Sequence, residues 1–290
     1  AQESAPPPPP PPPPAEHPAW APRFDALRLE RSRPLGRGAF GEVFLVKAFS
    51  TEGVGSAAVD GGENGLAAAF ALKRSSVAQL TGAGLDRAKD EARLLQQLGE
   101  EHESILRCFD FRITSGTSPT LELLLEFAAL GDLNCRLRAR AEQCAAAGTG
   151  GVADDSSAGL PEAEVVSFAC DVAAGLAHIH ALTPKVLHRD IKPANVVLFP
   201  VDGQQVTQAL CIGVECVPRA KIADFGIAKI LESDGSFVGA VTVIGTPHYF
   251  SPEICRGQKY DEKSDAWALG CVIYEMICLR RPFHEAEGNI

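Results

Sequence analysis

The chain has 290 residues, of which 46% are hydrophobic and 22% charged, so it can form one large or two small domains with an apolar core. Its formal net charge of −10 argues against a general nucleic-acid binder, which needs a basic face. No apolar run approaches the roughly 18 residues of a membrane-spanning helix, and nine cysteines without metal-ligand spacing indicate reduced thiols in the cytosol or nucleus.

The N-terminal part begins with an unbroken proline run, residues 6–14, which favours an extended polyproline II segment. We expect residues 1–23 to be a disordered linker, with a ligand for an aromatic-grooved adaptor domain as the alternative. Strand-like patterns follow over residues 41–49 and 70–73. A Gly/Ala-rich stretch, residues 50–69, separates them.

The rest of the chain contains one further strand pattern and several helical ones. Residues 85–98 have helical spacing, residues 121–127 form an apolar strand pattern, and residues 139–159 have the composition of an inserted loop. Pro161 opens a helix that continues to about His180. Residues 265–279 are apolar almost all round, which predicts a buried helix. Strands first and helices later predict an α+β fold with a small β-rich lobe joined to a larger helical lobe.

A Gly-x-Gly-x-x-Gly motif extends from Gly36 to Gly41. Dinucleotide-binding folds use the same spacing, but they need a helix directly after the glycines. Here β-branched and aromatic residues follow, so the glycines should connect two strands as a hairpin. Backbone N–H groups in such a hairpin can approach phosphate oxygens closely. An ordinary glycine-rich turn is the alternative.

Two charged residues lie in apolar surroundings and are candidates for an ion pair. Strand alternation places Ala71 and Lys73 on one face, as a cleft for a flat base and its phosphates would need. Glu91 lies within a helical apolar stripe, where a carboxylate is costly unless a cation meets it. We predict that Lys73 is that cation. A solvated lysine and an exposed glutamate are the alternatives.

Two later motifs contain polar residues that could take part in a reaction. In the segment His188-Arg-Asp-Ile-Lys-Pro-Ala-Asn195, Asp190 can accept the hydrogen of a substrate hydroxyl and Lys192 can neutralise charge on a moving phosphoryl group. Asn195 and the carboxylate of Asp224, in Asp-Phe-Gly, supply oxygen ligands of the kind that magnesium prefers. With the glycine hairpin, these are the parts needed to transfer a phosphoryl group from ATP to a hydroxyl.

These residues closely resemble the eukaryotic protein kinase family over roughly residue 27 to the C-terminus. The resemblance implies a bilobal kinase domain over residues 24–290, with lobes of about 24–126 and 127–290. It implies that Glu91 holds Lys73, that Leu125 is the gatekeeper, and that ATP and Mg²⁺ are used. The residues it assigns to the nucleotide are Leu35, Gly36, Arg37, Gly38, Ala39, Phe40, Gly41, Glu42, Val43, Ala71, Lys73, Glu126 and Ala128.

The same resemblance makes Asp190 the catalytic aspartate, assisted by Lys192, and makes Asn195 and Asp224 the metal ligands. Asp265 would brace the catalytic loop. Residues 245–253 look like a platform for a protein substrate, which small-molecule kinases generally lack. A kinase-shaped scaffold without activity is the main alternative to an enzyme.

Finer features resemble one branch of the family. Lys192 and the string Gly245-Thr-Pro247 are similar to serine/threonine kinases, and residues 245–255 and 263–276 resemble the NIMA-related (NEK) kinases. This likeness implies a cytoplasmic protein, with association with the cytoskeleton or a nuclear location as alternatives. Thr242 is the best candidate for a regulatory phosphosite, ahead of Ser233 and Ser236.

The sequence also departs from the family. Residues 50–69, 139–159 and 199–219 are longer than the usual connections. The first and third flank strands of the two lobes, so surface loops can absorb them at modest entropic cost. The family's C-terminal lobe continues for several helices past the buried one, whereas this chain stops at Ile290. We therefore expect an incomplete C-terminal lobe with exposed apolar surface.

Overall fold

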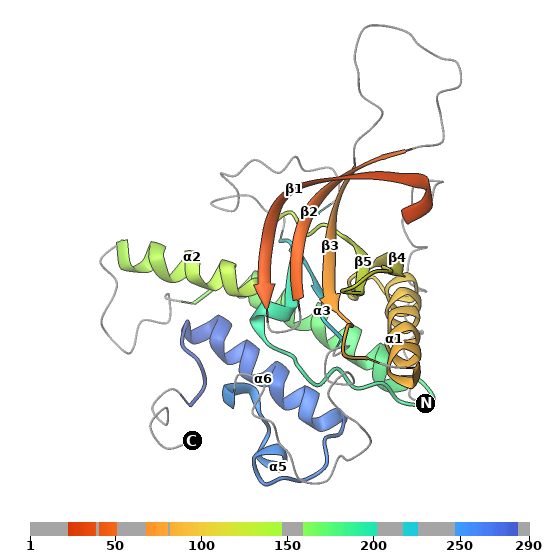
Figure 1. Cartoon of the computed structure of the whole chain (residues 1–290). Coiled ribbons are helices and arrows are strands. Elements are labelled where there is room, and N and C mark those ends of the chain that lie inside the picture. The colour runs from red at the N-terminus through yellow and green to blue at the C-terminus, as the bar shows by residue number, and fades with distance from the viewer. Residues whose placement is uncertain are drawn as a thin grey trace, which may run out of the picture.

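The structure is a computed structural model that describes residues 23–38, 41–50, 68–80, 82–146, 159–201, 217–225 and 247–283. A five-stranded sheet lies above a group of helices, and one further helix, α1, lies beside the sheet (Figure 1). Strands and helices are thus segregated, and the predicted α+β class is confirmed.

The sheet is antiparallel throughout, with strand order β1-β2-β3-β5-β4. Its strands are β1 (Leu27–Gly38), β2 (Gly41–Ser50), β3 (Ala68–Ser76), β4 (Cys108–Ile113) and β5 (Thr120–Glu126). The predicted strands correspond to β2, β3 and β5. The sequence reading missed β4, an edge strand with one fully buried residue and no clear alternation of apolar and polar residues.

Each face of the sheet packs on its own apolar cluster. One cluster includes Phe70 and Leu72 of β3 together with Phe24, which lies in the short 3-10 helix η1 (Phe24–Ala26). The other includes Ala71 and Leu125 and continues into the helices below the sheet. Alternate residues of β3 therefore serve opposite faces, as strand geometry requires.

A row of alternating charges crosses all five strands on the face that carries the smaller cluster. Arg37, Glu42, Arg74, Glu122 and Arg112 are successive register partners on β1, β2, β3, β5 and β4. The Glu122 carboxylate is buried and accepts from Arg74 Nε at 2.8 Å and Arg112 Nε at 2.9 Å. At the other end, Arg37 pairs with Glu42 at 3.5 Å. Opposite charges on directly facing positions stabilise the pairing of strands.

Helix α1 (Gly82–Glu101) contains the predicted helical segment and buries Ala88, Ala92, Leu95 and Leu98 against the larger cluster. Helix α2 (Leu133–Ala146) was not predicted. Its second half overlaps residues 139–159, which we expected to be an insertion, so residues 139–146 of that segment are helical. Because α2 buries only Leu133 and Leu137, its sequence carries no apolar stripe that would have revealed a helix.

Helix α3 (Glu162–Ala181) begins directly after Pro161, as predicted, and contacts both α6 and the strand β7 (Arg219–Ile222). Strand β7 pairs with β6 (Val196–Phe199), which follows the short 3-10 helix η2 (Pro193–Asn195). Among the described residues, no helix is long and apolar enough to cross a membrane.

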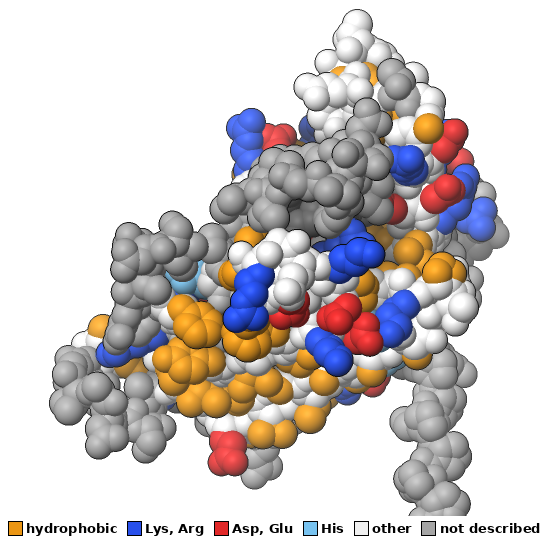
Figure 2. Space-filling view, turned by 90° about the horizontal axis from the view of Figure 1, so that it is seen from below, with side chains coloured by type: hydrophobic (Ala, Val, Ile, Leu, Met, Phe, Trp, Pro, Cys, Tyr) orange, Lys and Arg blue, Asp and Glu red, His pale blue; other side chains and the backbone are white. Residues whose placement is uncertain are grey.

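Helix α6 (Glu262–Cys278) matches the last predicted helix, but it is not buried all round. Trp267, Tyr274 and Ile277 expose 38%, 41% and 55% of their surface, and the Trp267 ring stacks on Phe283. The view from below likewise shows hydrophobic side chains gathered on that side of the molecule (Figure 2). Two short elements, η3 (Pro247–Tyr249) and α5 (Pro252–Cys255), precede α6.

Candidate active site

The glycine motif forms the hairpin that the sequence predicted. Strands β1 and β2 pair up to Gly38 and Gly41, and no helix follows the glycines, so a dinucleotide-binding motif is excluded. Gly41 has φ of +139°, and a Cβ there would collide with the Arg74 carbonyl oxygen. Only glycine therefore fits this close approach of the hairpin to β3. Ala39 and Phe40, at the tip, lie outside the described residues.

Lys73 lies on the sheet face that turns toward the helices. Its register partners are Val43 on β2 and Leu123 on β5, and its neighbour on the same face, Ala71, is buried opposite Leu125. The predicted sharing of one face by Ala71 and Lys73 is thus confirmed. Burial lowers the pKa of Lys73 to about 8, although the Asp190 carboxylate acts in the opposite direction.

The predicted pair of Lys73 and Glu91 is not formed in this structure. The Lys73 ammonium bonds to the Asp224 carboxylate instead. Both Glu91 carboxylate oxygens are buried and have no hydrogen-bond partner among the described residues. Burial raises the pKa of Glu91 to about 8, against an opposing effect of the nearby Arg189 charge, so Glu91 is mainly neutral at pH 7.

Asp190, Lys192 and Asn195 come together in one loop between α3 and β6. Asp190 Oδ2 accepts from Lys192 Nζ at 2.8 Å and from Asn195 Nδ2 at 2.9 Å. Asn195 Nδ2 also donates to the Asp190 carbonyl at 2.8 Å. These bonds hold the Asp190 carboxylate in place, and they use the amide nitrogen of Asn195, so its amide oxygen is the atom that could serve as a metal ligand.

Asp224 is connected to this loop through the backbone beside it. The N–H of Ala223 donates to the Asn195 carbonyl at 2.8 Å, and the Ala223 carbonyl lies 3.0 Å from His188 Nε2. His188 is fully buried, and its ring contacts Phe225 edge-on at 4.9 Å. The loop and the end of β7 thus form one unit that brings Asp190, Asn195 and Asp224 into the same region.

The donor set fits a hard cation. Among the described residues, no group of three His, Cys, Asp or Glu side chains could hold a metal ion on its own. The Asn195 amide oxygen and the Asp224 carboxylate offer two oxygen ligands. Magnesium in phosphoryl-transfer sites is held in this way, by one or two protein oxygens together with substrate phosphates and water.

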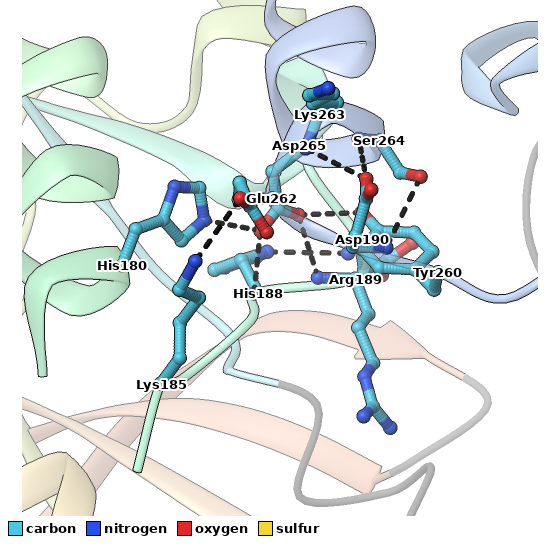
Figure 3. A network of polar contacts seen from close by, with 11 residues as sticks. His180, Lys185, His188, Arg189, Asp190, Tyr260, Glu262, Lys263, Ser264 and Asp265 are labelled. Carbon is cyan, nitrogen blue, oxygen red and sulfur yellow. Dashed lines mark hydrogen bonds and ion pairs between the residues drawn. The ribbon is translucent and has the colours of Figure 1, made fainter. Parts of the chain in front are cut away.

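Asp265, near the start of α6, anchors the loop that carries Asp190 through hydrogen bonds to its backbone (Figure 3). Its carboxylate is fully buried and accepts from the backbone N–H groups of His188 at 3.0 Å and Arg189 at 2.9 Å. His180 Nε2 lies 2.8 Å from the same carboxylate, and the Tyr260 hydroxyl donates to it at 2.5 Å. The family resemblance predicted the bracing role of Asp265, but no role at this site was predicted from the sequence for His180 or Tyr260.

With this geometry established, the chain was compared with known proteins. The family model described as protein kinase domain matches residues 29–290. The chain belongs to the protein kinase family. Its sheet above a group of helices is accordingly a kinase fold, and the family as a whole uses ATP and a divalent metal.

Similar curated proteins are NEK serine/threonine kinases. The chain is 32% identical over 261 residues to "Probable serine/threonine-protein kinase nek3" of Dictyostelium discoideum, covering 90% of this chain and 19% of that protein. It is 32% identical to Nek4 of Mus musculus (89% and 26%) and 37% identical to Nek2 of Homo sapiens (67% and 36%). The chain thus spans between about a fifth and about a third of the length of these relatives.

The segment that the family resemblance predicts to be the hinge begins at Glu126, the last residue of β5. The Glu126 side chain accepts from Arg107 N at 2.7 Å and from Lys221 Nζ at 2.8 Å, and its backbone N–H donates to the Arg107 carbonyl at 3.0 Å. The bond from Lys221 connects the predicted hinge to β7, and this contact was not predicted from the sequence. The Ala128 carbonyl accepts from Gly131 N at 3.1 Å in the turn that follows.

The segment that resembles a substrate platform contacts α6. The Glu253 carboxylate accepts from Ser264 Oγ at 2.6 Å, which lowers the pKa of Glu253, and the Tyr249 hydroxyl donates to the buried carboxylate of Glu275. Ser264 is also part of the capping box that starts α6 after Asp261. The predicted residues Gly226, Ile227, Ser233, Ser236, Thr242, Gly245 and Thr246 lie outside the described residues.

Proposed function

We propose that this domain transfers the γ-phosphoryl group of ATP to serine and threonine hydroxyls of protein substrates, with Mg²⁺ as the metal. The observation that carries the proposal is the loop in which Lys192 and Asn195 bond to the Asp190 carboxylate, connected through Ala223 to Asp224. The NEK serine/threonine kinases among the relatives support the same activity. Because the chain spans only part of those relatives, the proposal concerns this domain.

The Asp190 carboxylate is the group that accepts the hydrogen of the substrate hydroxyl and orients it for attack. Its bonds to Lys192 and Asn195 fix its position without the help of substrate. The Lys192 ammonium lies 2.8 Å from the carboxylate, so it can offset negative charge on the phosphoryl group as this group passes. The protein mainly supplies position and charge.

Asn195 and Asp224 are the proposed metal ligands, and the bound metal would neutralise charge on the phosphate oxygens. In this structure the Lys73 ammonium forms an ion pair with the Asp224 carboxylate. We infer that nucleotide binding releases Lys73 toward the phosphates and toward the carboxylate of Glu91. Glu91 would then lose its proton, because a cation beside it favours the charged form.

The nucleotide is proposed to lie between the glycine hairpin, from Leu35 to Val43, and the hinge residues Glu126 and Ala128. Ala71 and Lys73 face the same side of the sheet as Val43, which supports this location. We propose the domain limits 24–290, with the two lobes meeting near residue 126.

Substrate preference and regulation remain predictions. We propose Thr242 as a phosphosite, and we propose that the β-branched Ile227 favours threonine over serine as the acceptor. The proline run, residues 6–14, is proposed as an adaptor ligand. We further propose a cytoplasmic location, with association with the cytoskeleton or a nuclear location as the alternatives that the family resemblance leaves open. Among the described residues nothing favours an inactive scaffold, since Lys73, Asp190, Asn195 and Asp224 are all present.

The test is magnesium-dependent transfer of phosphate from ATP to a generic protein substrate by the full-length protein and by its Asp190→Ala variant. Asp86→Ala, an exposed aspartate on α1, is the matched control. We expect loss of transfer in Asp190→Ala only, with similar melting temperatures for all three proteins. Equal transfer by Asp190→Ala would refute the assignment, and no transfer by folded, activation-loop-phosphorylated wild type would favour a scaffold.

A further inference from the structure

Tyr260 makes a contact whose role the sequence reading did not assign. It precedes Asp261, the N-cap of α6, and its hydroxyl donates to Asp265 Oδ1 at 2.5 Å (Figure 3). Because the capping box of Asp261 and Ser264 fixes the first turn of α6, the tyrosine backbone is held beside the carboxylate it contacts. Of the other two tyrosines in the chain, Tyr249 donates to Glu275 and Tyr274 is exposed on α6.

The donors to Asp265 are divided between its two oxygens. Oδ2 lies 3.0 Å from His188 N and 2.8 Å from His180 Nε2, whereas Oδ1 lies 2.9 Å from Arg189 N and 2.5 Å from the Tyr260 hydroxyl. Each oxygen thus has one donor from the loop backbone and one from a side chain. A fully buried carboxylate depends on such donors for its orientation.

The oxygen that Tyr260 contacts holds the most strained point of the loop. Arg189 has φ of +66°, a left-handed conformation that residues other than glycine adopt at a cost. The bond from its N–H to Asp265 Oδ1 helps to maintain that conformation, and Asp190 is the next residue. A shift of Oδ1 therefore moves the peptide that carries the proposed catalytic carboxylate.

The Tyr260 hydroxyl is a donor under all physiological conditions. Burial raises its pKa above the ordinary value of 10, and the Asp265 carboxylate raises the pKa further. The phenol therefore keeps its proton. His180 Nε2 donates to the carboxylate only in the tautomer or charge state that places a proton on that nitrogen, whereas the Tyr260 hydroxyl always carries its own proton.

We propose that Tyr260 is a positioning residue for phosphoryl transfer, which acts through Asp265 Oδ1 on the backbone of Arg189 and so on Asp190. The inference rests on the proposed function. It predicts that removal of one oxygen atom, which contacts neither nucleotide nor substrate, lowers the rate of transfer while binding of both stays the same.

The test compares Tyr260→Phe with wild type in the full-length protein, with Tyr274→Phe as the matched control because that tyrosine is exposed on α6. Steady-state kinetics would give kcat per nucleotide-binding site, counted by titration with a fluorescent ATP analogue. We expect kcat of Tyr260→Phe to fall about tenfold, as loss of a hydrogen bond to a charged group predicts. KM for ATP and for a peptide should change less than twofold, and Tyr274→Phe should match wild type.

A double-mutant cycle with Asp265→Asn tests whether the effect passes through Asp265. In that background, Tyr260→Phe should change kcat less than twofold. Unchanged kcat of Tyr260→Phe would overturn the inference, and so would a tenfold loss that persists in Asp265→Asn or a loss explained by fewer nucleotide-binding sites. A wild-type protein without transfer would instead overturn the proposed function and this inference together.

Discussion

Substitution of Glu91 by glutamine should make the nucleotide-free domain more stable while it impairs the proposed activity. The Glu91 carboxylate is buried without a hydrogen-bond partner among the described residues, and burial raises its pKa from 4.5 to about 8. An amide of the same shape carries no charge to desolvate, so it avoids this penalty. It cannot, however, replace the carboxylate that we propose to hold Lys73 when nucleotide is bound.

The size of the effect follows from the pKa. The unfolded chain releases the Glu91 proton near pH 4.5, whereas the folded domain keeps it up to about pH 8. The folded state therefore binds more protons in this window, and its stability decreases as pH rises through it. At about 1.36 kcal/mol for each pKa unit, the upper limit at pH 7 is about 3 kcal/mol. Partial solvent screening reduces this to about 1.5 kcal/mol.

The assay is thermal unfolding of the nucleotide-free protein between pH 5 and pH 8. For a domain of this size we expect Glu91→Gln to raise the melting temperature at pH 7 by about 3–6 °C. The gain should be small at pH 5 and largest at pH 8. Glu100→Gln, an exposed glutamate on the same helix, is the control and should show no such pH dependence. A Glu91→Gln gain that is absent at pH 8, or larger at pH 5, would refute this reasoning.

Three further substitutions test the buried ion pairs of Glu122 and the surroundings of two helical glycines. Glu122→Ala leaves two arginine side chains around a buried position without their carboxylate, so we expect a loss of about 3 kcal/mol in chemical denaturation; a loss below 1 kcal/mol would contradict that role. Gly175→Ala places a Cβ 2.8 Å from the Ile222 side chain and should destabilise by about 1–3 kcal/mol. Gly270→Ala, which meets nothing within 4 Å on α6, should stabilise by about 0.5–1 kcal/mol, and the reverse order would refute both assignments.

The sequence predicted best what is local along the chain. The spacing of Asp190, Lys192 and Asn195 within one short segment already brought them together, and the strand character after Gly41 was enough to predict the hairpin. Helix α2 could not be predicted in this way, because only two of its side chains are buried and its other residues show no pattern.

Which carboxylate forms the ion pair with Lys73 was harder to predict, because the answer depends on how distant parts of the chain pack together. The sequence indicated a carboxylate inside an apolar stripe at Glu91, but two carboxylates compete for one ammonium, and Asp224 is the partner of Lys73 in this structure. Tyr260 and Asp265 presented a different problem. A buried aspartate at the start of an apolar helix needs hydrogen-bond donors. Tyr260 is close to Asp265 in the sequence and has a hydroxyl donor, so it could have been identified on this ground.

The row of alternating charges across the sheet has a consequence for folding. Its members meet only when all five strands pair in the native alignment. A slip of any strand by one residue would turn its charged member toward the larger apolar cluster and leave its neighbours facing no opposite charge. Misaligned sheets are therefore penalised at every strand boundary, so the row favours the alignment in which Gly41 lies against the Arg74 carbonyl.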